Sequence, residues 1–292
     1  VAQDASFTGL GWSLITGGCV TRIVRQKDDL RNSTGYMFAG ALPPSLLNNE
    51  YDYANGNISA DGAYCDNVYY GQIDAEPDIF SYNFCGHSGR FVIGKNSAGA
   101  PVFMDKKNSM DIKYINGGWI FTDASGYEYY LTTSESSQNY YRSALTELTT
   151  LTGINNLNFD INLTPTTAWY IDSIIAPGKE KITFSYVRGK SLSLFNKSEQ
   201  LFKLAQMSVQ GSCTSPPAVT NDYHSYDVSR QDIIDIYLQK IEFTNGKVEL
   251  KYSNRLDIDF LTLQTGFLQP SKLDSILIKD ASGNFIKGFS LS

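Results

Sequence analysis

The feature that most constrains the fold of this chain is a hairpin pattern that recurs along it. In its clearest form, residues 238–244 and 247–252 alternate between polar and apolar side chains and are joined by Asn245-Gly246. Alternation with a period of two predicts half-buried strands, and Asn-Gly between strands favours a type I′ turn because both turn residues need positive φ. This segment is therefore predicted to be a β-hairpin. Its inward-facing residues after the turn are predicted to be Val248, Leu250 and Tyr252.

The same pattern occurs at four further places. Each has an alternating run, a short turn that contains glycine, and a second run with alternate apolar residues. These hairpins are predicted within residues 80–93, 113–130, 169–186 and 272–289. A single hairpin is marginally stable alone, so hairpins in series are expected to pair edge to edge. We therefore predict an all-β fold of serial antiparallel β-hairpins that form a large curved or spiralling sheet.

Two stretches interrupt the pattern and are predicted to be long loop insertions, at about residues 28–64 and 188–232. The first is rich in Asn, Gly, Ser and Pro, with a short helical piece expected around residues 44–47. No low-complexity tract or charged linker divides the chain, so residues 1–292 are predicted to be a single β-rich segment. Because Val1 falls in what should be the middle of a strand, we expect a fragment of a longer chain.

Composition argues against several functional classes. The 24 Lys and Arg against 30 Asp and Glu give a net charge of −6, which provides no positive field for nucleic acid. Two histidines in 292 residues exclude a multi-histidine metal centre, and no cofactor is predicted. No apolar run approaches the roughly 18 residues of a membrane-spanning helix, so no membrane span is predicted. The 19 Tyr and 24 Gly are typical of sheets and turns.

Four cysteines leave the redox state open. They are Cys19, Cys65, Cys85 and Cys213, and none has the C-x-x-C spacing of a zinc or thioredoxin-like site. In an oxidising compartment they could form up to two disulfides in one of three pairings. In a reducing one they could be buried free thiols that act as small apolar side chains.

Two lines of the sequence carry a family resemblance. Gly9-Leu10-Gly11-Trp12 begins the first line, and Glu76-Pro77-Asp78 begins the second. They resemble the G-L-G-W-x-L-x-x-G-G-x-I-x-R and E-P-D-x-F-x-x-N-F-x-G-x-S-G-x-F blocks of Rhs/YD-repeat-type secreted bacterial surface proteins. The matching residues are Gly9, Gly11, Trp12, Gly17, Gly18 and Arg22 in the first line, and Glu76, Pro77, Asp78, Phe80, Asn83, Phe84, Gly86, Gly89 and Phe91 in the second.

The resemblance implies a segment that lies ahead of the YD repeats, since no Y-D-x-x-G-R repeat appears in this chain. Such proteins are secreted or lie at the outer surface of Gram-negative bacteria, and their consecutive hairpins wall off a hollow shell. The implied partners are the remainder of the chain's own longer protein or other cell-surface proteins, with glycans as a further class.

The motif residues also have physical roles that need no catalysis. The glycines would supply tight turns or close strand approach, and Trp12 a large buried anchor. Arg22 is expected to pair with a motif acid, Glu76 or Asp78, through a charge-assisted contact.

Two His-Ser pairs, His87-Ser88 and His224-Ser225, were considered as catalytic candidates. Neighbouring residues in a strand point to opposite faces, so adjacency does not make a nucleophile and its base. No G-x-S-x-G elbow is present, and surface histidines are the favoured interpretation. A polar loop that contains His224 and Asp227 lacks the further histidine or cysteine that a metal site needs. No catalytic residue is assigned.

Three acids alternate at Asp74, Glu76 and Asp78 and could share one side of an extended segment. Paired carboxylates serve as glycosidase acid and base or bind calcium, so a glycan-active hydrolase is the third functional hypothesis. A structural role for this motif is favoured. Two Asp-Ala-Ser-Gly turns, at residues 123–126 and 280–283, are expected to have an aspartate that caps its own backbone.

The tyrosine surplus suggests a sugar-stacking surface. Its candidates are Trp119, Tyr129, Tyr130, Tyr140 and Tyr141. Cross-strand aromatic pairs within the sheet would explain the same residues equally well. The sequence therefore favours a non-catalytic scaffold, with a surface carbohydrate-binding or adhesive module as the alternative.

Overall fold

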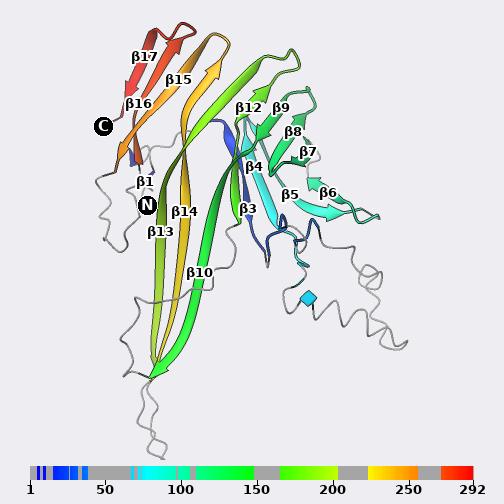
Figure 1. Ribbon diagram of the computed structural model, residues 1–292, viewed down its shortest axis with the longest axis vertical. Helices are drawn as coiled ribbons and strands as arrows, with labels where there is room; N and C mark the ends of the chain where they lie inside the picture. The colour runs from blue at the N-terminus through cyan, green and yellow to red at the C-terminus, as the bar shows by residue number, and fades with distance from the viewer. Residues whose placement is uncertain are drawn as a thin grey trace, which may run out of the picture.

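The computed structural model describes residues 5–6, 9–10, 16–25, 27–31, 35–38, 67–68, 72, 74–96, 98–105, 110–147, 165–202, 223–255 and 271–291. Within these ranges the regular structure is almost entirely β-strand (Figure 1). The strands are β1 (Ala5–Ser6), β2 (Gly9–Leu10), β3 (Gly18–Ile23), β4 (Ile79–Phe84), β5 (His87–Lys95), β6 (Pro101–Asp105), β7 (Met110–Ile115), β8 (Gly118–Asp123), β9 (Glu128–Leu131), β10 (Thr133–Glu147), β11 (Thr166–Tyr170), β12 (Ser173–Ile175), β13 (Lys181–Phe202), β14 (Tyr223–Phe243), β15 (Gly246–Asn254), β16 (Ser271–Asp280) and β17 (Phe285–Ser290).

Fifteen of these strands form one antiparallel sheet. Its main path runs β6-β5-β4-β3-β11-β10-β14-β13-β12-β9-β8-β7, and β15, β16 and β17 follow one another from an edge of β14. The long strands β10, β13 and β14 lie between the group of β3 to β9 and the group of β15 to β17 (Figure 1). Strands β1 and β2 pair in a separate two-stranded sheet. The predicted all-β fold of serial antiparallel hairpins in a large sheet is confirmed.

The type I′ turn of the structure lies at a different Asn-Gly pair from the predicted one. Asn116-Gly117 between β7 and β8 has φ of 53° and 83°, the positive pair that a type I′ turn requires. Asn245-Gly246 does not, because Phe243 pairs with Gly246 and the turn residues are Thr244 and Asn245. The predicted hairpin is present there, but the predicted turn type is wrong. Gly246 is instead needed for close strand approach, since a Cβ on it would lie 2.4 Å from the Lys279 carbonyl oxygen.

Two of the predicted hairpins divide further. Residues 113–130 form two successive hairpins, β7–β8 and β8–β9, because Asn116-Gly117 turns the chain before the glycine at 126 does so again. The run predicted as one strand from residue 169 to 175 breaks into β11 and β12. At the break, the Asp172 carboxylate accepts hydrogen bonds from the Thr132 backbone N–H (2.8 Å) and hydroxyl (2.9 Å).

The insertion predicted at residues 188–232 is mostly strand where the structure describes it. Strand β13 continues to Phe202 and β14 begins at Tyr223, and they pair over both extensions with one register shift, between Arg188 and Ser191. The prediction failed here because it relied on alternating side chains, whereas a ladder of backbone hydrogen bonds needs none. Residues 203–222 lie outside the described residues, as do 39–64 of the other predicted insertion, including the expected helical piece.

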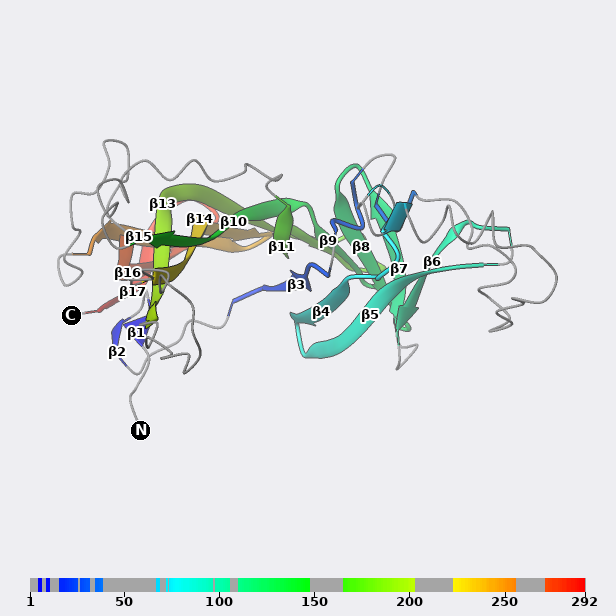
Figure 2. The same cartoon turned by 90° about the horizontal axis from the view of Figure 1, so that it is seen from below.

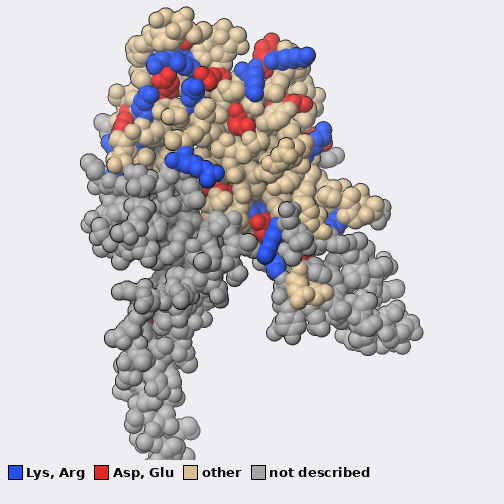
Figure 3. Space-filling model, in the orientation of Figure 1, with Lys and Arg blue, Asp and Glu red and all other residues tan. Residues whose placement is uncertain are grey.

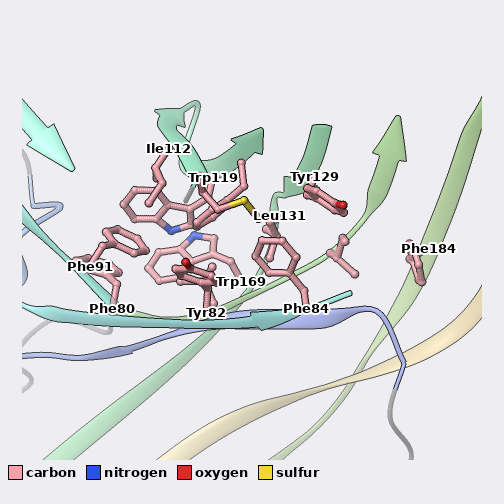
Figure 4. Close-up of a cluster of buried hydrophobic side chains, with 14 of the residues drawn as sticks. Phe80, Tyr82, Phe84, Phe91, Ile112, Trp119, Tyr129, Leu131, Trp169 and Phe184 are labelled. Atoms are coloured by element: carbon pink, nitrogen blue, oxygen red, sulfur yellow. The ribbon is translucent and has the colours of Figure 1, made fainter. Parts of the chain in front are cut away.

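The core lies where the sheet turns back on itself, so that β3, β4, β5 and β11 face β7, β8 and β9 (Figure 2). Aromatic rings from both layers meet between them (Figure 4). The Trp119 ring centroid lies 5.0 Å from that of Phe91, 5.1 Å from that of Phe80 and 5.7 Å from that of Trp169. The aromatic residues of the second motif line are therefore core residues, since Phe80, Phe84 and Phe91 are at most 1% exposed.

The sheet of β14 to β17 has one apolar and one charged face. Leu250 is 3% exposed, and Val248 and Tyr252 pack partly buried against the core, as predicted. On the other face Glu249 lies within 3.5 Å of three lysine ammonium groups, those of Lys279, Lys247 and Lys251. Hydrogen bonds from the first two lysines lower the pKa of Glu249 to about 2. Figure 3 shows basic and acidic side chains mixed over this end of the molecule rather than separated by sign.

Gly17 and Gly18 of the first motif line occupy backbone positions that other residues rarely adopt, with φ of 59° and 116°. A Cβ on Gly18 would lie 2.2 Å from the Asn83 carbonyl oxygen. We expect Gly18→Ala to lower the free energy of unfolding by about 2–3 kcal/mol, measured by urea denaturation. Gly86→Ala is the matched control, because Gly86 also has positive φ (84°) but a Cβ there meets nothing within 4 Å. Its expected loss is only about 1 kcal/mol, and equal losses would contradict the role of close strand approach.

Candidate functional site

Arg22 is the centre of the most unusual polar cluster among the described residues. It lies in β3 opposite Phe80, and its side chain is completely buried. The guanidinium lies over the rings of Phe80 and Trp169, 5.9 and 5.5 Å from their centroids. Its Nη1 lies 2.5 Å from Asp28 Oδ1 and 3.4 Å from Asp78 Oδ2. The predicted pairing of Arg22 with a motif acid is confirmed for Asp78.

Asp78 is the principal acceptor of this cluster, and its carboxylate is also completely buried. Oδ1 accepts a hydrogen bond from the Arg25 backbone N–H (2.7 Å), and Oδ2 accepts one from the Asp29 backbone N–H (3.2 Å). The backbone N–H of Asp78 in turn donates to Asp29 Oδ2 (2.9 Å). Burial raises the pKa of Asp78 to about 6, although these donors and the nearby Arg22 charge oppose the rise. The motif acid therefore fastens the loop after β3 to the start of β4.

The three alternating acids do not share one side. Asp74 and Asp78 are buried, whereas the Glu76 side chain is 44% exposed and pairs with Arg25 at the surface. The third buried carboxylate is Asp29, which the sequence analysis placed in an insertion and did not single out. Nothing in the local sequence distinguishes Asp29 from a solvent-exposed loop aspartate, because its burial depends on residues about 50 positions away.

This arrangement is suited to holding backbone rather than to chemistry on a ligand. The carboxylates of Asp29 and Asp78 each accept a backbone N–H from the other's segment, and that of Asp74 accepts the Glu76 N–H two residues along its own segment. Within the described ranges, no three His, Cys, Asp or Glu side chains are placed so that they could hold a metal ion. A glycosidase pair needs two carboxyl groups that face a sugar in an open site, and these carboxylates are buried.

A second polar cluster joins two hairpin ends. His87 Nε2 lies 3.6 Å from Asp123 Oδ2 and 3.3 Å from the Tyr129 hydroxyl, which donates to Asp123 Oδ2 at 3.0 Å. Asp123 also caps its own turn by accepting the backbone N–H of Ser125 (2.8 Å), as predicted. The equivalent Asp280 accepts the backbone N–H of Asn284 (2.8 Å). The side chain of His224 lies outside the described residues.

The predicted sugar-stacking surface is wrong for two of its five residues. Trp119 is 0% exposed and Tyr129 is 5% exposed, because the strands of the opposite layer cover them. Tyr130 is partly buried, and its hydroxyl donates to Glu128 Oε2 (2.8 Å). Tyr140 and Tyr141 lie in β10 opposite Arg230 and Ser229, but their side chains lie outside the described part.

The remaining motif residues serve the turns and the sheet. Gly86 turns the chain from β4 to β5, and Asn83 pairs with Cys19 across β3 and β4. Gly89 leaves room for Tyr82, whose ring would otherwise meet a Cβ, and the Tyr82 hydroxyl donates to Asp105 Oδ2 (3.0 Å).

Pro77 separates the exposed Glu76 from the buried Asp78. Gly9 lies in β2, whereas Gly11 and Trp12 lie outside the described residues.

Two of the four cysteines can be assigned. Cys19 and Cys85 are free thiols, and burial raises the pKa of both. Cys65 and Cys213 lie outside the described residues.

Comparisons with known proteins give no match: no family model fits the chain, and no curated protein or solved structure is similar to it. No helix in the described part of the chain is both long and apolar enough to cross a membrane.

Proposed function

We propose that this chain is a non-catalytic structural segment of a secreted, Rhs/YD-like protein at the outer surface of a Gram-negative bacterium, where it contributes to a β-sheet shell. Two features support this role. Consecutive antiparallel hairpins build one large sheet, which is the element that a wall requires. The described motif residues lie in the core, in turns and in loop contacts, and the buried carboxylate of Asp78 accepts backbone N–H groups from Arg25 and Asp29.

The observation that carries the proposal is strand β17. All six of its residues are exposed, and among the described strands it pairs only with β16. Phe285, Ile286 and Phe289 are 64%, 62% and 48% exposed and occur on both faces of the strand. An apolar edge strand is a template for a further strand. In a shell that strand would come from the remainder of the protein or from another surface protein.

We expect Ile286→Lys to weaken association through this edge, because a lysine on an edge strand opposes pairing. In sedimentation velocity over a range of concentrations, the purified chain should associate, and the variant should do so about tenfold more weakly. The matched control is Ile115→Lys, which places the same charge on another exposed strand residue, 46% exposed in β7. A chain that stays monomeric, or a control that acts like Ile286→Lys, would contradict the role of β17.

A carbohydrate-binding or adhesive module is the second candidate, favoured by the exposed rings of Phe285, Phe289 and Tyr127. Aromatic faces of this kind stack on sugar rings. A glycan array separates the two functions. Glycan binding that Phe289→Ala removes and Ile115→Lys leaves intact would favour the module over the scaffold.

A further inference from the structure

Asp29 and Asp74 are two buried carboxyl groups, and each has one oxygen that receives no hydrogen bond. Asp29 is 0% exposed and Asp74 is 1% exposed. One oxygen of each has a partner: Asp29 Oδ2 accepts the Asp78 backbone N–H (2.9 Å), and Asp74 Oδ1 accepts the Glu76 backbone N–H (3.2 Å). The other two oxygens, Asp29 Oδ1 and Asp74 Oδ2, receive no hydrogen bond from any donor group in the described part of the chain.

The two side chains are nevertheless within hydrogen-bonding reach of each other. Two ionised carboxylates are acceptors only, so such a contact is a hydrogen bond only when one of them carries a proton. Without that proton, two like charges would face each other in a buried site, which is strongly unfavourable. We propose that Asp29 and Asp74 share one proton, and that this proton forms a pH-dependent latch between the loop that carries Asp29 and residues 74–78.

Burial, with the negative charge of Asp78, favours the protonated form of the pair. Burial is the main cause that raises the pKa of Asp29 to about 8, and the negative charge of Asp78 adds to it. Burial also raises the pKa of Asp74, against the Glu76 and Tyr36 backbone N–H groups and the Lys27 charge. Arg22 and Arg25 interact with the neighbouring Asp78 and Glu76, and the pKa of the Tyr36 phenol is raised by burial and by the acidic pair.

The sign of the pH dependence follows from these shifts. The pKa of Asp29 in the folded chain lies above the value of about 3.9 for an unfolded aspartate. The latch is therefore at full strength below about pH 4 and weakens as the pH rises, until the proton is lost at about pH 8. Over that interval its opening equilibrium should increase by at most about tenfold per pH unit.

Hydrogen–deuterium exchange of the whole chain tests the latch. The reporters are the backbone amides of Asp29 and Asp78. Each donates to the carboxylate of the other residue, between the two segments that the latch joins. Their protection factors, already corrected for the intrinsic effect of pH, should fall at least about tenfold between pH 5 and pH 9. The amide of Phe121 in the core strand β8, which lies between β7 and β9, should show no such fall.

Asp29→Asn separates the shared proton from a general effect of pH. An asparagine can accept the Asp78 N–H and donate its amide N–H to Asp74 at every pH. Protection in this variant should therefore lose the fall that the shared proton causes and keep only the effect of Asp78, whose pKa burial raises to about 6. Asp74→Asn should act alike from the other side. Asp111→Asn, which changes an exposed aspartate of β7, should keep the pH dependence of the unchanged protein.

Two results would overturn the proposal. One is an unchanged pH dependence in both Asp29→Asn and Asp74→Asn. The other is protection at pH 9 that appears with millimolar CaCl2 and disappears with EDTA, because a cation rather than a proton would then join the carboxylates.

Discussion

Replacing Trp119 with alanine is expected to lower the free energy of unfolding by about 3–5 kcal/mol. Trp119 is 0% exposed and lies between the two layers of the sheet (Figure 4). Its neighbours are aromatic, with ring centroids 4.7 Å away at Tyr114, 5.0 Å at Phe91 and 5.1 Å at Phe80. Rigid rings cannot easily collapse into the space that the indole leaves, so most of the cavity should persist. Urea denaturation measures the loss.

Phenylalanine substitutions distinguish packing from hydrogen bonding at the two buried tryptophans. Trp119 Nε1 has no hydrogen-bond partner among the described residues, whereas Trp169 Nε1 donates to the Gly117 carbonyl oxygen at 2.8 Å. Trp119→Phe keeps a ring and removes an unpaired buried N–H, and Trp169→Phe removes a made hydrogen bond. We expect Trp169→Phe to cost about 1 kcal/mol more than Trp119→Phe. Phe285→Ala, at a side chain that is 64% exposed, should change stability by less than about 0.5 kcal/mol.

The hairpins were predictable because their signals are local. Alternation and a nearby turn are enough to locate the pairing of β14 with β15 or of β16 with β17, since the paired residues and the turn lie within some 20 residues. The pairings that join the hairpins were not predictable. Strand β11 pairs with β3, about 150 residues earlier in the sequence. The N-terminal part of β14 pairs with β10. These choices depend on which faces bury one another, and the period of a strand does not encode its partner.

The candidate site, too, could be predicted from the sequence only in part. The motif lines were enough to predict that Arg22 pairs with Glu76 or Asp78, but the choice of Asp78 comes from the structure, where both side chains are buried. Asp29 could not be found, because a loop aspartate carries no periodic signal. The aromatic residues were ambiguous for a different reason. Tyrosines and tryptophans occur both on exposed sugar-binding surfaces and in hydrophobic cores. Trp119 is buried because β4 and β5 cover it, which its local sequence does not indicate.

Asp78→Ala is expected to destabilise the chain by about 3–5 kcal/mol at pH 7, whereas Glu76→Ala, two residues away, should cost at most about 1 kcal/mol. The two acids belong to one motif but lie in different environments. Glu76 forms an exposed ion pair with Arg25, and both side chains are 44% exposed. Asp78 is buried beside Arg22, whose side chain is 0% exposed.

The loss at Asp78 should come from the groups that it leaves behind. Burial raises the pKa of Asp78 to about 6, so the ionised carboxylate is itself costly to bury. Its removal, however, leaves Arg22 with Asp28 as its remaining charged partner and deprives the backbone N–H groups of Arg25 and Asp29 of their acceptor. Asp78→Asn retains one acceptor oxygen, which can serve only one of the two N–H groups because the amide NH2 is a donor, and it is therefore expected to lose less than Asp78→Ala. Equal losses in the alanine and asparagine variants would show that the carboxylate charge, and not the orphaned N–H groups, accounts for the stability.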